Sequence, residues 1–78
     1  MPSTFYTKLV DTLGVYTGKE KAVGVIERQI KHAANGPDLF GPSDLKSILN
    51  FVTAAAKLYV ADAAKRDEML KRLESLAA

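Results

Sequence analysis

The sequence predicts an all-α fold, a small helical domain in which two short helices pack on a long C-terminal helix. Two observations predict it. Apolar residues recur at helical spacing along most of the chain, and residues typical of helix starts and ends separate these stretches. At 78 residues the chain is expected to form a single domain, with a helical hairpin over 1–35, a connector over 36–41 and a long amphipathic helix over 42–78.

The first helix is expected from about Thr4 to Leu13. Ser3 precedes it as a candidate N-cap, and Phe5 and Leu9 recur at helical spacing. Gly14 can adopt the left-handed conformation that often ends a helix. The sequence therefore predicts a short helix with one apolar side.

A second helix is expected to open at Thr17, because Thr17 and Glu20 form a capping-box pattern, and to run through about Ala34. Asn35, Gly36 and Pro37 then stop it. Gly24 lies inside this helix, where glycine costs roughly 1 kcal/mol relative to alanine. Close approach of another helix would compensate for this glycine, and a tolerated weakness explains it about as well.

The connector leads into a well-marked helix start. Gly41 is the expected N-cap, the proline after it suits the first helical position, and Asp44 places a carboxylate in the first turn. Phe40 and Leu45 have the spacing of a hydrophobic staple. This staple favours a place in the domain's own core for Phe40 and its neighbour Leu39 over an exposed hook for a partner.

From Pro42 to Ala78 there is no glycine and no further proline, so a continuous helix of roughly 54 Å is expected. Steps of four and three pick out a heptad-like seam typical of a coiled coil. The seam comprises Leu45, Leu49, Val52, Ala56, Tyr59, Ala63, Arg66, Leu70, Leu73 and Ala77. A break near 60–62 that creates a fourth helix remains the alternative, because globular helices usually span about 8 to 20 residues.

The first half of this helix is apolar over most of its circumference, so it needs cover from several sides. Two short helices provide little cover, and a domain of this size often needs added stabilisation such as oligomerisation. We therefore predict a non-enzymatic protein–protein interaction or self-assembly module, such as a scaffold, an assembly subunit or a small regulatory adaptor. The expected partner is a second copy, as in a homodimer or higher homo-oligomer, or a helical protein. The expected interface consists of Phe51, Ala55, Leu58, Tyr59, Val60, Ala63, Leu70 and Leu73. Leu45, Ile48, Leu49 and Val52 are expected to face the two short helices instead.

The alternative function is that of a small DNA-binding transcriptional regulator. Lys21, Arg28, Lys31 and His32 could form a basic face on the second helix. The net charge of only +2, with basic and acidic residues interleaved, argues against a strong commitment to nucleic acid.

Catalysis, cofactors and metals are not expected. The chain has no cysteine and a single histidine, too few ligands for zinc. No pair of carboxylates is spaced for acid–base work, and no glycine-rich phosphate-binding pattern is present. The chain contains neither a signal-peptide pattern nor an apolar run of the roughly 20 residues that a membrane span needs. These features predict a soluble, cytoplasmic protein.

Overall fold

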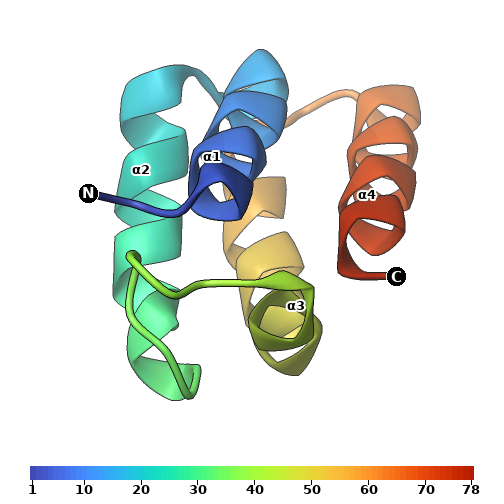
Figure 1. Ribbon diagram of the computed structural model, residues 1–78. Helices are drawn as coiled ribbons and strands as arrows, with labels where there is room; N and C mark the ends of the chain where they lie inside the picture. Colours follow the sequence, from blue (N-terminus) through green and yellow to red (C-terminus); the bar gives the residue numbers. More distant parts are fainter.

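The computed structural model describes residues 1–78 and confirms the all-α fold (Figure 1). It contains four α-helices, two short 3₁₀ segments and no strand. The helices are α1 (Thr4–Thr17), α2 (Lys19–Gln29), α3 (Pro42–Ala56) and α4 (Ala63–Ala77), and the 3₁₀ segments are η1 (Ile30–His32), which follows α2, and η2 (Lys57–Tyr59), which follows α3.

The four helices enclose one core. α1 contacts both α2 and α4, and α3 contacts the same two helices, so α1 and α3 lie diagonally across the bundle. Each helix turns an apolar side inward, and the core holds 16 buried residues. Its largest fully buried side chains are Phe40, Leu9, Leu13, Ile26, Leu45, Ile48, Met69, Leu73 and Val52.

The turn between α1 and α2 differs from the prediction. Ser3 is the N-cap of α1, as expected, and its Oγ accepts a hydrogen bond from the Tyr6 N–H at 3.0 Å. The expected end at Gly14 and the expected start at Thr17 are both wrong, because α1 continues to Thr17 and the chain turns at Gly18, with φ of 87°. That positive φ suits glycine, and it allows the next helix to start immediately.

A hydrogen bond and aromatic packing hold the connector against the start of α1. Ser3 Oγ donates to the Phe40 carbonyl at 2.7 Å, and the Phe40 ring is buried between the rings of Phe5 and Tyr6. Leu39 points into solvent, so the core placement expected for both connector residues holds only for Phe40. α3 then begins at Pro42, as predicted.

The expected continuous helix over 42–78 is wrong, and the alternative with a fourth helix is confirmed. α3 passes into η2, and the chain reverses before Asp62, whose carboxylate caps α4 by accepting from the N–H groups of Ala64 and Lys65 at 2.8 and 3.2 Å. The side chain of Arg66 also donates to the Val60 carbonyl in the turn. The reversal lets the apolar side of α4 cover α3, a gain in burial that an extended helix lacks.

Candidate functional site

An uncovered apolar surface lies beside the C-terminal end of α3. A groove of about 250 Å³ runs there between α2 and the C-terminal end of α3 with η2. On the α2 side it is lined by Lys21, Gly24 and Arg28, and on the other side by Ala55, Leu58 and Tyr59. We call this feature the α2–α3 groove.

Aromatic contacts hold the two walls of the α2–α3 groove in an antiparallel arrangement. At one end, Lys21 Nζ lies 5.6 Å from the centre of the Tyr59 ring. At the other, the rings of His32 and Phe51 stack with centroids 4.9 Å apart and planes at 22°. Lys21 lies in the first turn of α2, whereas Tyr59 follows the C-terminal end of α3. The two contacts therefore fix how α2 and α3 are aligned along the groove.

Three large apolar side chains along the groove stay in contact with water. Phe51 keeps 49% of its surface exposed, Leu58 82% and Tyr59 44%. Ala55 lies half-buried between them. Clustered exposed hydrophobics of this kind mark interaction sites more often than isolated ones do.

The eight predicted interface residues separate into two groups. Phe51, Ala55, Leu58 and Tyr59 lie together at the groove. Val60 and Leu73 are buried in the chain's own core, because α4 folds back over α3. Leu70 is half-buried on α4 and Ala63 is exposed there, outside the groove.

The residues predicted for nucleic-acid contact converge on the same place. Lys21 and Arg28 line the groove, and His32 stands at its end on the Phe51 ring. Lys31 is exposed but does not line the groove. The only ion pair in the chain joins the N-terminal amine to Asp38, so Lys21 and Arg28 have no acidic partner within the fold.

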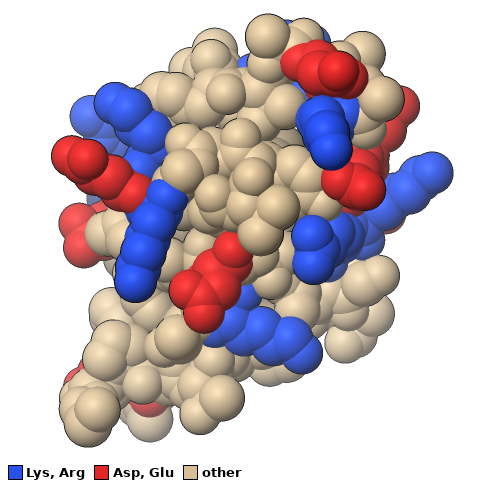
Figure 2. Space-filling view, turned by 90° about the horizontal axis from the view of Figure 1, so that it is seen from above, with Lys and Arg blue, Asp and Glu red and all other residues tan.

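Sequence reasoning missed two contributors to this region. Gly24 lines the groove, and its position inside a helix was the signal that could have identified it. Val15 is exposed near the end of α1 and shares a second, smaller hollow with Tyr59. Seen from the end of the molecule where α1 joins α2, a tract of uncharged residues lies among basic and acidic side chains (Figure 2).

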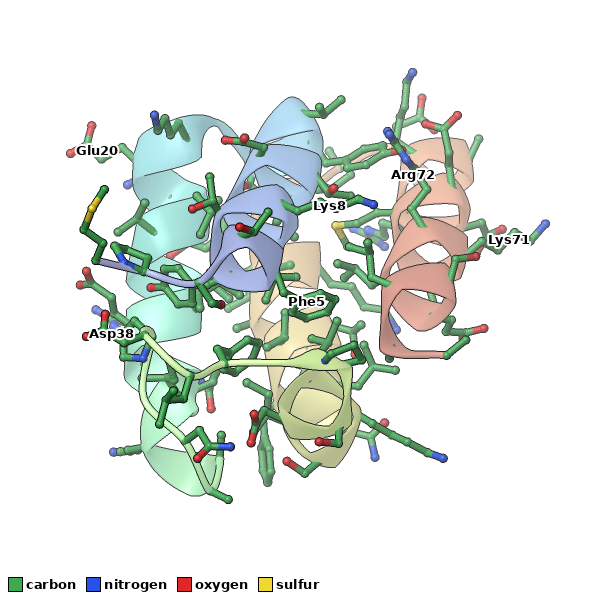
Figure 3. All side chains as sticks on the ribbon, viewed as in Figure 1. Phe5, Lys8, Glu20, Asp38, Lys71 and Arg72 are labelled. Atoms are coloured by element: carbon green, nitrogen blue, oxygen red, sulfur yellow. The ribbon has the colours of Figure 1, made fainter.

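A polar hollow between α1 and α4 is the other notable surface feature. Lys8 and Arg72 lie near one another there, and Lys71 extends outward from α4 (Figure 3). Arg72 is engaged within the fold, because its Nη1 donates to the Tyr16 hydroxyl at 3.1 Å. This hollow has one apolar lining residue, Leu76, and so offers little surface for hydrophobic binding.

The buried acid of the fold has a structural task. The Asp44 carboxylate accepts hydrogen bonds from Asn35 Nδ2 at 3.1 Å and from the Gly41 N–H at 3.0 Å. The bond from Asn35 is the main reason that the pKa of Asp44 falls below its ordinary value, and burial opposes this shift. Asp44 therefore fixes the start of α3, as expected from the sequence.

No three histidine, aspartate or glutamate side chains gather closely enough to hold a metal ion. None of the helices combines the length and apolar character that crossing a bilayer requires. The chain matches no model of a known family, no curated protein and no solved structure at a significant level.

Proposed function

We propose that the protein is a non-enzymatic protein–protein interaction module that binds a helical segment of its partner in the α2–α3 groove. The observation that supports this proposal is the exposure of Phe51 on α3 and of Leu58 and Tyr59 on η2 beside a groove, while the large residues Leu45, Ile48 and Val52 of α3 are buried. Amphipathic helices commonly bind by laying an apolar side into such a groove. A scaffold, an assembly subunit or a small regulatory adaptor would use this activity.

The size of the apolar surface favours a docked helix over a broad, flat dimer interface. About half of each aromatic side chain is exposed, on the order of 100 Å² per ring. A standard protein–protein interface buries about 800 Å² on each partner. The groove supplies a few anchor positions, which matches the small number of residues that carry most of the energy in helix recognition.

Self-association remains the second form of the proposal, and charge disfavours it. A symmetric dimer places the same surface of both copies together. Lys21 and Arg28 would then approach their counterparts, and Glu20 is the only acid of the groove that could offset them. Light scattering over a concentration series distinguishes the two forms, since a module that binds another chain keeps the mass of one 8.5 kDa chain.

Site-specific photo-crosslinking in cells that naturally make the protein tests the proposal. A photo-reactive amino acid in place of Leu58 is expected to form an adduct with a defined partner, because this side chain projects into the groove region. The matched control carries the same group in place of Ala64, an exposed residue of α4. Phe51→Glu should abolish the Leu58 adduct. No adduct at Leu58, or the same adducts from both positions, would contradict the proposal.

Nucleic-acid binding is the competing function, and the basic residues beside two exposed rings are the observation that favours it. It predicts DNA binding that falls steeply as salt rises, because phosphate contacts release counterions. It also predicts weaker binding in Arg28→Ala. The interaction module is expected to show no such binding in an electrophoretic shift assay at low salt.

A further inference from the structure

Nothing inside the fold requires a glycine at position 24, within α2. A Cβ atom added there would meet no other atom within 4 Å. Gly18 is the only glycine with positive φ, so the backbone at Gly24 accepts any residue. Glycine inside a helix nonetheless costs roughly 1 kcal/mol relative to alanine. Close approach of another helix, one of the two explanations that the sequence left open for Gly24, is therefore absent within the chain, and the space above the glycine is open.

Gly24 stands in the wall of the α2–α3 groove, between Lys21 and Arg28. Small residues at such a position let the backbone of a second helix approach closely, whereas any larger side chain would narrow the groove. The half-buried Gly24 therefore leaves room for an occupant that packs against α2 from outside.

The charges along α2 specify the occupant further. Lys21 and Arg28 are seven residues apart and lie on one side of α2, and His32 follows four residues later in η1, so the three span about 16 Å, roughly three turns. Glu20 is the only acid that lines the groove. Glu27 does not line the groove.

The opposite wall offers apolar contacts with matching spacing. Phe51, Ala55 and Leu58 follow one another at steps of four and three. A bound helix can meet them with apolar residues at the same steps, while its neighbouring side faces the basic residues of α2.

We propose that the groove binds an acidic amphipathic helix of about three turns from a different protein chain, packed closely against Gly24. This inference rests on the proposed interaction function and names its partner class. A second copy of the chain does not supply such a helix. α4 exposes Asp67, Glu68 and Glu74, but its apolar residues Met69 and Leu73 are buried.

Two designed peptides test the charge requirement. Each is a helix-stabilised peptide of about 15 residues with leucines at steps of three and four, and with either glutamates or lysines on one flank. The glutamate peptide should shift the backbone amide NMR signals of residues 21–32 and 51–59 in the full chain. The lysine peptide should bind about tenfold more weakly or worse. Equal binding of both peptides, shifts elsewhere, or no shifts at millimolar peptide would overturn the acidic-helix assignment.

Gly24→Leu tests the close approach. Leucine favours helix more than glycine does and its Cβ meets no atom within 4 Å, so the variant should melt at the same temperature as the unmodified protein or higher. Its side chain would enter the groove and weaken the glutamate peptide about tenfold or more. Ala64→Leu, which adds the same side chain on α4, should leave binding unchanged. Full binding by a folded Gly24→Leu would overturn the inference.

The outcomes separate this inference from the proposed function. Crosslinks specific to Leu58, combined with equal binding of both peptides, would keep the interaction module and remove the acidic helix as its partner. An absence of crosslinks would contradict the interaction function itself. The peptide shifts would then show only that the groove can bind such a helix, and not that a natural partner does so.

Discussion

Two sides of α3 carry large apolar residues, and the surroundings of these two sides are opposite. Its inner side carries Leu45, Ile48 and Val52, each fully buried against the other helices. Phe51 lies on its outer side and Leu58 lies in η2, which continues it, and both are exposed beside the α2–α3 groove. Apolar residues on one helix therefore serve the chain's own stability on one side and remain available for binding on the other.

The difference arises from the helices that flank α3. α4 turns back and covers one side with Met69 and Leu73. On the other side, α2 contributes a glycine and two long basic side chains, which border the surface without covering it. The amount of apolar surface on a helix thus indicates a need for cover, while the neighbouring helices determine which part of that surface stays exposed.

The largest effect expected from this comparison comes from truncating one residue on each side of α3. Ile48→Ala should lower the free energy of unfolding by about 2–5 kcal/mol, because it leaves a cavity in the core. Leu58→Ala should change it by no more than about 0.5 kcal/mol, because Leu58 is mostly exposed. Urea unfolding monitored by circular dichroism measures both. Similar losses would mean that the outer side also supports the fold.

A smaller effect is expected at Asp44, which fixes the first turn of α3 and with it the direction of each side. Asp44→Ala should cost about 1–2 kcal/mol at neutral pH, through loss of the cap and of the bond from Asn35. The pKa of Asp44 is lowered in the folded state. Its contribution is therefore complete above the ordinary carboxyl pKa of about 4 and is lost as pH falls through the lower folded value.

Urea midpoints measured between neutral and strongly acidic pH check this expectation. The difference between the unmodified protein and Asp44→Ala should shrink on acidification. Asp67→Ala removes an exposed acid from α4 and serves as the control, with little expected change at neutral pH. A difference that stays constant down to low pH would show that the Asp44 charge does not hold α3.

Local signals predicted the parts of the fold that depend on local interactions. The caps at Ser3 and Asp44 were recognisable because each side chain bonds to backbone groups a few residues away. The break before Asp62 was left open, because no glycine or proline marks it and burial of α4 against α3 decides it. The turn glycine was misassigned, since both Gly14 and Gly18 suit a helix end when tertiary contacts are unknown.

Half of the residues predicted for an interface, Phe51, Ala55, Leu58 and Tyr59, remain at the surface, and the reason is again local. Phe51 follows from the helical pattern of α3, and Leu58 continues that pattern into η2, although local signals mark only the start of α3. Val60 and Leu73 look equally suitable in the pattern, but they are buried once the chain reverses. The groove itself depends on how α2 lies beside α3, and no local signal describes that.

Substitution of glycine 24 by alanine gives the smallest and most specific effect. Gly24→Ala should raise the free energy of unfolding by about 0.5–1 kcal/mol, because alanine is the better helix former and its Cβ meets no atom. Gly18→Ala, at a φ of 87°, should instead lower it by about 1–3 kcal/mol. Thermal unfolding of the two variants compares them. If Gly24→Ala destabilised the protein, the glycine would serve the fold after all, and the open groove would need another explanation. If it stabilises the protein as expected, the chain keeps a destabilising glycine beside its exposed apolar surface, which is consistent with a role in binding rather than folding.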